Sequence, residues 1–525
     1  MTSDELQDYY TFILKEVRDA GEYFLQSKNE AIAVEKKSAH ELVTKYDKNI
    51  EALLVSKIRA KYPNHKFIGE EASEVANTKT TLTNDPTWII DPVDGTTNFS
   101  RKIPMSGISV GLTINKEQIL GVVNIPYLNE FYSALKGHRA FLNGEPIRCS
   151  NITDPKEAVL CYEIGAASRS TQYHKLIMSR LNVLMNEVLA VRCFGCPILS
   201  QCYVASGKLD VYQCDGLHPW DAAAGTIIVK EAGGSVMESS GEAFDVMQPN
   251  FLELLTADDI NIETKNGNSW DLVTMYDRRI EDLLIDKLKQ EYTDHKFIGE
   301  EESSAKKNIA TLTDRPTWII DPIDGTANFV KSMPLSCISV GLTIHKEQVL
   351  GIVYNPYMNE LYTAVKGKGA FLNGRRVYTS GETELKKCLF DYELSLAIQN
   401  EHLRDLYLNR LHYIISKISG IRTYGSAALG LCYVACGRVD AYQCDGLFPW
   451  DAAAGSLIVR EAGGFITDTS GKEFDLMKPN FLATATEVLA GEFMKIERMA
   501  DSLLYNNKEI KFIVDECKFN GQKAK

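Results

Sequence analysis

The sequence lacks the features that mark exported, membrane-embedded or nucleic-acid-binding proteins. No apolar run approaches the roughly 18 residues that a membrane-spanning helix needs, and the first eight residues are polar and acidic, unlike a signal or transit peptide. Asp and Glu number 70 against 57 Lys and Arg, for a net charge of −13, and no basic cluster offsets this balance. We therefore expect a cytoplasmic protein whose partners include neither a membrane nor nucleic acid.

A disulfide framework and a zinc site are also missing. The 12 cysteines are scattered without the regular spacing of disulfide-rich domains, so we expect reduced thiols. Cys193 and Cys196 form a C-x-x-C pair. A structural zinc site needs a second ligand pair at a suitable spacing, and the sequence offers none. Packing is the expected role of this pair.

What the sequence does contain is a long internal repeat. The segment Trp88–Thr96, W-I-I-D-P-V-D-G-T, recurs as W-I-I-D-P-I-D-G-T at Trp318–Thr326. The segment P-W-D-A-A-A-G at Pro219–Gly225 recurs unchanged at Pro449–Gly455, and both offsets equal 230 (318 − 88 and 449 − 219). This period far exceeds the roughly 20–50 residues of a solenoid unit, so it indicates a duplicated domain. We expect one domain at residues 1–255 and another at residues 256–525.

The repeat is incomplete at both ends. Residues 4–30 have the apolar periodicity of an amphipathic helix, but their counterparts, 234–260, already form the end of the first copy. Similarly, the predicted helix at 487–504 has its counterpart at 257–274, where the second copy begins. Our hypothesis is that the two copies pack tightly and cover the surfaces that the missing helices would have covered.

Each copy mixes helices and strands. A short buried strand is predicted at Thr87–Asp91, and further strands at Gly107–Ile114, Ile119–Asn124 and Glu130–Leu135. Residues Asp221–Ala232 are predicted to form a helix that ends at Gly233-Gly234. The fold class is therefore α/β (α+β), with a substantial amount of antiparallel sheet.

The motif D-P-x-D-G-T carries the chemistry. Asp91 and Asp94 flank a proline that keeps the chain extended, and Gly95 permits a sharp turn after which a helix can begin at Thr96. Two carboxylates that converge here repel each other unless a cation or a proton neutralises them, and oxygen ligands suit Mg²⁺. Backbone amides at a helix start suit a phosphate. The motif therefore predicts a phosphoryl-transfer site.

A single D-P-x-D-G-T could be an ordinary turn with a helix cap. However, both copies have Gly-Glu-Glu 21 residues upstream (91 − 70 and 321 − 300) and Trp-Asp 130 residues downstream (221 − 91 and 451 − 321). Duplicated long-range spacing of acidic residues is hard to explain by packing alone. We therefore favour a metal and phosphate site in each copy.

These motifs resemble those of the inositol monophosphatase family. The resemblance rests on Gly-Glu-Glu, on W-I-I-D-P-[VI]-D-G-T-x-N-F, on G-x-x-A-F-L-N-G at Gly137–Gly144 and Gly367–Gly374, and on P-W-D-A-A-A-G. It covers nearly the whole chain, twice. It implies a layered αβαβα sandwich in each copy. It also implies a Mg²⁺-dependent, lithium-sensitive phosphatase that hydrolyses inositol monophosphate to inositol and phosphate with a metal-activated water.

The resemblance also implies roles for individual residues. Each domain would bind two to three Mg²⁺ ions, with Mn²⁺ as a substitute. Thr96 with Asp47, and Thr326 with Asp277, match the pair that positions the water, and Glu70 and Glu300 would help to take its proton. The metal ligands would be Glu70, Asp91, the Val93 carbonyl, Asp94 and Asp221 in the first copy, and Glu300, Asp321, the Ile323 carbonyl, Asp324 and Asp451 in the second.

Further positions match the family's substrate contacts. The phosphate would be held by the amides of Gly95 and Thr96, or of Gly325 and Thr326, close to Lys36 or Lys265. The family usually has a Glu before its G-[IL]-x-x-W-D segment, where this sequence has cysteines. Either the neighbouring aspartate rotates into the site or the ring is held differently. The remaining candidate substrate contacts are Asp94, Cys214 and Asp215 in the first copy, and Asp324, Ser426, Ala427, Cys444 and Asp445 in the second.

The two copies differ at one loop of the motif set. The second keeps the family's G-[ST]-A-A as Gly425–Ala428, whereas the first reads Gly-Cys-Pro-Ile at Gly195–Ile198. Pro197 has no N–H, so we expect the first copy to lose a backbone donor to the sugar. Both copies are expected to bind Mg²⁺, with the second as the better catalyst on an inositol-like ring.

Two alternatives to inositol monophosphate hydrolysis remain. One is a phosphatase for another small phosphate ester, such as a sugar bisphosphate or a 3′-phosphonucleotide. The other is a regulatory pseudoenzyme that binds metal without turnover, although a pure binder does not need a water-positioning pair. In each case the expected partner is a small phosphate ester. We further expect the chain to be an intramolecular pseudo-dimer without another obligate partner.

Overall fold

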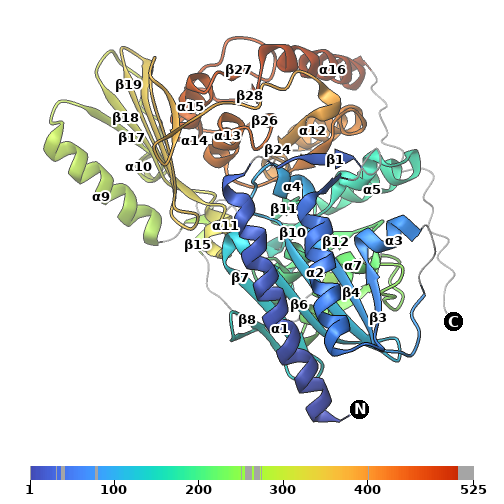
Figure 1. The fold of residues 1–525 in the computed structure, drawn as a ribbon. Helices are drawn as coiled ribbons and strands as arrows, with labels where there is room; N and C mark the ends of the chain where they lie inside the picture. The colour runs from blue at the N-terminus through green and yellow to red at the C-terminus, as the bar shows by residue number, and fades with distance from the viewer. Residues whose placement is uncertain are drawn as a thin grey trace.

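The chain forms two lobes of the same architecture, as shown by a computed structural model (Figure 1). The last described strand of the first lobe ends at Leu254, and the first described strand of the second begins at Glu263. The predicted boundary between residues 255 and 256, and Lys265, lie outside the described residues. The structure describes residues 2–30, 32–36, 42–76, 81–249, 251–254, 263–264, 272–273, 275–399 and 401–506.

The larger sheet of each lobe has seven strands in sequence order. The first two strands are parallel and all other neighbours are antiparallel. In the first lobe they are β3 (Lys66–Gly69), β4 (Thr87–Asp94), β5 (Gly107–Ile114), β6 (Glu117–Ile125), β7 (Glu130–Leu135), β8 (Ala140–Leu142) and β9 (Glu145–Ile147). In the second they are β17 (Lys296–Gly299), β18 (Thr317–Asp324), β19 (Cys337–Ile344), β20 (Glu347–Asn355), β21 (Glu360–Val365), β22 (Gly369–Leu372) and β23 (Arg375–Val377).

The smaller sheet of each lobe has five strands that cross over in sequence. Its order is β11-β10-β12-β14-β13 in the first lobe and β25-β24-β26-β28-β27 in the second. The strands are β10 (Val159–Tyr162), β11 (Ala190–Arg192), β12 (Val211–Cys214), β13 (Ser235–Glu238) and β14 (Phe251–Leu254), then β24 (Leu389–Tyr392), β25 (Gly420–Arg422), β26 (Ala441–Cys444), β27 (Phe465–Thr467) and β28 (Phe481–Thr484). Two short hairpins add β1 (Val34–Lys36) with β2 (Leu42–Thr44), and β15 (Glu263–Thr264) with β16 (Leu272–Val273).

Helices form the other layers and complete the predicted αβαβα sandwich, which is confirmed. No helix in the described ranges combines the length and apolar character that crossing a membrane requires. The first lobe has α1 (Ser3–Leu25), α2 (Lys45–Lys61), α3 (Glu70–Ala76), α4 (Thr96–Ser100), α5 (Thr171–Leu184), α6 (Pro197–Ala205), α7 (Pro219–Ala222) and α8 (Gly225–Glu231). The second has α9 (Met275–Glu291), α10 (Glu300–Lys306), α11 (Thr326–Val330), α12 (Glu401–Ile414), α13 (Ala427–Ala435), α14 (Pro449–Ala452), α15 (Gly455–Glu461) and α16 (Glu487–Asn506).

The prediction of one continuous helix at residues 221–232 is wrong. Residues 221–232 are not one helix, because α7 ends at Ala222 and α8 begins at Gly225. Side chains from other elements donate hydrogen bonds to the backbone carbonyls at this break. The amide of Gln201 donates to the Asp221 carbonyl at 2.6 Å, and that of Gln118 donates to the Ala223 carbonyl at 2.8 Å. A carbonyl held by a side chain can leave the helical ladder without becoming an unsatisfied buried acceptor.

The hypothesis that the lobes cover the surfaces of the missing helices is also wrong. In the first lobe α1 and α2 lie side by side on the large sheet, whereas α9 lies alone on the second one (Figure 1). Leu361 and Val365 of β21 are accordingly 39% and 47% exposed, while their counterparts under α1, Phe131 and Leu135, are 8% and 3% exposed. On the first lobe Val183 of α5 is 59% exposed.

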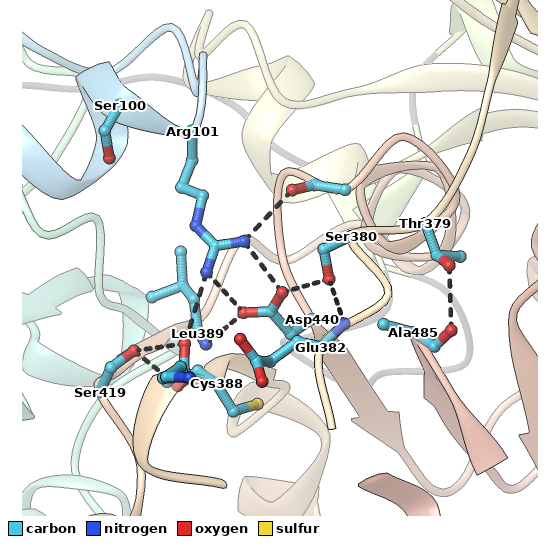
Figure 2. A network of polar contacts seen from close by, with 12 residues as sticks. Ser100, Arg101, Thr379, Ser380, Glu382, Cys388, Leu389, Ser419, Asp440 and Ala485 are labelled. Carbon is cyan, nitrogen blue, oxygen red and sulfur yellow. Dashed lines mark hydrogen bonds and ion pairs between the residues drawn. The ribbon is translucent and has the colours of Figure 1, made fainter. Parts of the chain in front are cut away.

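The lobes nevertheless share an interface built from reciprocal charge pairs. The guanidinium of Arg101, just after α4, donates to both carboxylate oxygens of Asp440 at 2.9 Å. Figure 2 shows this carboxylate between Arg101 and Ser380, and it also accepts the backbone N–H of Leu389 at 2.7 Å. In the equivalent pair, the cation comes from the second lobe and the carboxylate from the first: Lys331 pairs with Asp210 at 2.5 Å. Both aspartates are fully buried, so each depends on its cation from the other lobe.

We predict that Asp440→Asn lowers the free energy of unfolding by about 3 kcal/mol, because it leaves Arg101 without its buried partner. Urea unfolding followed by fluorescence measures the effect. The matched control is Glu384→Gln, which breaks a pair of exposed side chains with Lys387 and should cost less than about 1 kcal/mol. Equal losses in the two variants would contradict the role given to Asp440.

Candidate active site

The end of strand β4 sets the geometry of the first site. All eight residues of β4 are buried, and its pairing with β5 is interrupted by a bulge between Asp91 and Asp94. Gly95 follows with φ of +74°, and α4 begins at Thr96. A side chain at Gly95 would be strained by this φ and would lie 3.0 Å from the Met105 carbonyl. The same turn occurs after β18, where Gly325 has φ of +81°.

Three carboxylates meet at this turn in each lobe. Asp91 and Asp94 lie at the end of β4, and Asp221 is brought beside them by α7, where its side chain accepts the His218 N–H at 2.7 Å. In each lobe, one oxygen from each of the three residues can be chosen so that all lie within 4.8 Å of one another. The second cluster comprises Asp321, Asp324 and Asp451.

Burial gives these carboxylates unusual proton affinities. It raises the pKa of Asp91 well above its ordinary value, and the neighbouring Glu70, Asp94 and Asp221 add to the rise. It likewise raises the pKa of Asp94 to about 8, with Asp221 contributing. Burial also raises the pKa of Asp321, Asp324 and Asp451. Protons or a cation are needed to stabilise such a cluster, and an all-oxygen donor set fits a hard divalent metal ion.

A second acidic group lies close to the first. Asp47, Glu70 and Glu71 also place carboxylate oxygens within 4.8 Å of one another. Asp47 is fully buried at the start of α2, where it accepts the N–H and the hydroxyl of Thr44 at 2.8 and 2.5 Å. Burial raises its pKa to about 6. Glu71 was not among the predicted residues, although the Gly-Glu-Glu motif contains it.

The predicted water-positioning residues lie between these groups. The hydroxyl of Thr96 donates to the Val93 carbonyl at 3.1 Å and lies 3.5 Å from the carboxylate of Asp47. In the second lobe the hydroxyl of Thr326 donates to the Ile323 carbonyl at 3.0 Å, and Asp277 is fully buried in α9. The side chain of Lys36 lies outside the described part of the structure, although its backbone belongs to β1.

The loop that differs between the copies contacts the carboxylate cluster. In the second lobe Asp324 accepts the hydroxyl of Ser426 and the N–H groups of Ala427 and Ala428, the latter two at 3.1 and 2.9 Å. In the first lobe Asp94 accepts the Ile198 N–H at 2.8 Å and the Cys196 thiol at 3.2 Å. The donor that Pro197 lacks would thus serve this carboxylate, which corrects the expectation that it serves the sugar.

The aspartates that follow Cys214 and Cys444 contact other side chains of the protein. The sequence had suggested that they contact the substrate. Asp215 pairs with Arg180 at 2.6 Å. Asp445 accepts the hydroxyl of Thr469 at 2.6 Å, and its other oxygen lies 4.0 Å from Arg410. Cys444 itself lines the pocket over the second cluster. Arg180 holds the first carboxylate and the Thr469 hydroxyl holds the second, and spacing in the sequence did not reveal these contacts.

The pocket of the second lobe includes residues from both lobes. Asp321, Asp324, Asp451 and Thr326 line it together with Arg192 from β11 of the first lobe. Arg192 was not predicted, and the signal that could have found it is its identical counterpart, Arg422, 230 residues on. Glu393, also missed, lines the same pocket and accepts the N–H of Gly425 at 2.8 Å.

The short helix after each glycine turn, α4 or α11, is held by an arginine of the other lobe. Arg192 donates to the side-chain oxygen of Asn328 in α11 at 2.9 Å, and Arg422 donates to that of Asn98 in α4 at 3.0 Å. The amide nitrogen of Asn98 donates in turn to the carbonyls of Met105 and Phe194 at 2.7 and 2.8 Å. The turn at Gly95 is thereby linked to the opposite lobe.

Comparisons with known proteins agree with two copies of one domain. A sequence model of the inositol monophosphatase family matches residues 5–256 and again residues 250–500. An inositol monophosphatase 2 of Solanum lycopersicum is 48% identical over 215 residues, which span 41% of this chain and 81% of the relative. An inositol monophosphatase of Mesembryanthemum crystallinum is 44% identical over 242 residues, 46% of this chain and 88% of the relative.

Among solved structures, the IMPase of Thermotoga maritima is 34% identical and covers 46% of this chain and 89% of its own, with a TM-score of 0.41. The assignment rests on the two sequence matches, which together span most of the chain. The predicted tandem duplication is confirmed by them. The chain therefore belongs to the inositol monophosphatase family, as a phosphoric monoester hydrolase with two tandem copies of the family's domain.

Proposed function

We propose that both lobes hydrolyse a small phosphate monoester, that inositol monophosphate is the substrate, and that Mg²⁺ is the metal. The observation that carries the proposal is the duplicated cluster of three buried carboxylates beside a glycine turn. Similarity to inositol monophosphatases at 44–48% identity supports the substrate. A domain boundary at 255/256, a cytoplasmic location and lithium sensitivity belong to the same proposal.

In each lobe the metal would be held by the three clustered aspartates together with one glutamate and one backbone carbonyl. They are Glu70, Asp91, the Val93 carbonyl, Asp94 and Asp221 in the first lobe, and Glu300, Asp321, the Ile323 carbonyl, Asp324 and Asp451 in the second. When bound, Mg²⁺ supplies charge neutralisation and lowers the pKa of a coordinated water. Two to three ions per lobe match the number of acidic groups, and Mn²⁺ accepts the same oxygen donors.

The remaining residues of the first site would orient the attacking water molecule and take up its proton. The Thr96 hydroxyl lies between Asp47 and the Val93 carbonyl, where it can hold a water molecule for attack. Asp47, whose pKa burial raises to about 6, can accept a proton near neutral pH, and Glu70 lies close enough to share this role. The amides at Gly95 and Thr96 would hold the phosphate. Thr326, Asp277, Glu300 and Gly325 take the same parts in the second lobe.

A covalent phosphoenzyme is not required by this arrangement. The thiol beside the first cluster belongs to Cys196, and burial next to Asp94 raises its pKa well above the ordinary value. A neutral thiol is a poor nucleophile. Its counterpart in the second lobe is Ser426, which donates to Asp324 and is thus engaged as a donor. Attack by water accounts for hydrolysis in both lobes.

The first test is phosphate release from inositol 1-phosphate with Mg²⁺, for the intact chain, Asp94→Asn, Asp324→Asn and the double variant. Because each change removes one metal ligand charge, we expect the double variant to lose on the order of 10³-fold in rate, and the single variants to divide the activity between the lobes. Asp286→Asn, at an exposed position of α9, is the control. Full activity of the double variant would sink the proposal.

Metal binding should depend on pH with a definite sign. A carboxylate whose pKa is raised on folding binds more protons in the folded state. Its contribution to stability is therefore fully present below the unfolded pKa near 4 and is lost as pH rises through about 8, the value for Asp94. Mg²⁺ requires the deprotonated groups. We thus expect the Mg²⁺-induced rise in melting temperature to grow between about pH 6 and about pH 8.

Melting curves with and without Mg²⁺ measure this effect, and the variant with both Asp94→Asn and Asp324→Asn serves as the control. Its Mg²⁺-induced rise should be smaller at every pH, because one ligand of each cluster is neutral. A rise in the intact chain that does not vary with pH would show that these carboxylates do not take up the metal.

Restoring the backbone N–H that Pro197 lacks should strengthen Mg²⁺ binding at the first site. Pro197→Ala adds an N–H at the position from which Ala427 donates to Asp324, so the pKa of Asp94 should fall. In a chain whose second lobe is silenced by Asp324→Asn, we expect half-maximal activity at about a tenth of the Mg²⁺ concentration. The reciprocal control, Ala427→Pro with Asp94→Asn, should need more Mg²⁺. Unchanged Mg²⁺ dependence in both chains would refute this account.

A further inference from the structure

The entrances of the two sites differ more than the carboxylate clusters do. In the second lobe the entrance is formed by Gly446, Leu447 and Phe448, which follow β26 and line the pocket. The equivalent loop of the first lobe, 230 residues earlier, consists of Gly216, Leu217 and His218. Because these loops lead into α14 and α7, they lie next to Asp451 and Asp221.

The first entrance is polar and positively charged. Arg169 donates to the Gly216 carbonyl at 2.6 Å, and a Cβ at Gly216 would lie 3.2 Å from both this guanidinium and the Tyr173 hydroxyl. The ring of His218 stacks on Trp220 with 4.7 Å between centroids. Arg169 is exposed, and in the described part of the chain no carboxylate lies within ion-pair distance of it.

At the equivalent sequence positions the second lobe has no charged residue. Gln399 replaces Arg169, Leu403 replaces Tyr173, and Phe448 replaces His218. Phe448 stacks on Trp450 with 5.0 Å between centroids and is 51% exposed. A methyl carbon of Leu403 lies 3.8 Å from the Cβ position of Gly446, whereas the Tyr173 hydroxyl lies 3.2 Å from that of Gly216.

The ion pairs of Arg180 and Arg410, close to these loops, also differ between the lobes. Arg180 of α5 has Asp215 as its partner at 2.6 Å, so this pair is neutral and Arg169 remains in excess. Its counterpart, Arg410, meets Glu497 at 3.2 Å and Asp501 at 2.7 Å, both supplied by α16, which has no counterpart among the described residues of the first lobe.

We propose that the first lobe accepts a phosphate ester that carries a second anionic group, bound at the entrance by Arg169 and His218, whereas the second lobe accepts an uncharged polyol phosphate. The inference rests on the proposed function, since it concerns which esters each site takes. A guanidinium gives charge-assisted hydrogen bonds to phosphate or carboxylate, and an exposed aromatic ring such as Phe448 packs on the apolar face of a polyol ring.

The test uses the full chain with one lobe silenced, by Asp324→Asn or by Asp94→Asn, and two substrates on the same ring. These are inositol 1-phosphate and inositol 1,4-bisphosphate. We expect the chain with only its first lobe active to have the lower KM for the bisphosphate, and the chain with only its second lobe active to show no such preference. Arg169→Gln, which installs the residue of the second lobe, should raise the KM for the bisphosphate by about 10-fold and that for the monophosphate less.

Conversely, Gln399→Arg with Phe448→His should lower the KM of the second lobe for the bisphosphate, and Arg169→Lys should retain part of the preference of the first. If Arg169→Gln raises both KM values equally, Arg169 only supports the Gly216 loop and the inference is overturned. It is also overturned if the first lobe shows no preference while still hydrolysing the monophosphate. If neither single-lobe chain releases phosphate from either ester, the proposed function itself fails.

Discussion

The mutual repulsion of buried carboxylates is the constraint on which each lobe depends. Two like charges about 5 Å apart repel by about 3 kcal/mol at an effective dielectric constant of about 20, and each cluster contains three such pairs. A chain can hold Asp91, Asp94 and Asp221 together only where rigid elements fix their backbones and protons or a cation neutralise them. The buried strand β4, the turn at Gly95 and the short helix α7 meet the first condition. Protons, or a divalent metal ion where one binds, would meet the second.

The contacts between lobes extend this constraint across the molecule. Asn98 and Asn328 stand next to the two glycine turns, and each accepts from an arginine of the opposite lobe. The guanidinium of Arg192 also lies 2.2 Å from where a Cβ at Gly425 would be, so the loop that holds Asp324 has no room for another residue there. Movement of one lobe against the other would therefore displace the turn that positions the acidic residues.

The sequence predicted the parts that repeat and missed those that depend on contacts across the fold. Asp91, Asp94 and Asp221 could be found because a strand, a turn and a duplicated spacing place them together. Arg192 could not, since its role arises from the opposite lobe and no local pattern marks it. Asp215 and Asp445 were misjudged because Arg180 and Thr469, from other elements of the chain, bind them. The exposed face at Leu361 shows that a missing helix need not be replaced.

Tandem linkage explains why the lobes differ where they do. In a symmetric homodimer every substitution changes both sites, whereas in this chain Pro197 or Arg169 alters the first site alone. Interface positions that reach the opposite site lack this freedom, because a change at Arg192 or Arg422 acts on the site of the other lobe. The observed differences follow this rule: the arginine and asparagine pairs are identical in both copies, and the carboxylates are all retained. The entrance loops, which are contacted by Arg169 and Tyr173 in the first lobe and by Leu403 in the second, carry the differences.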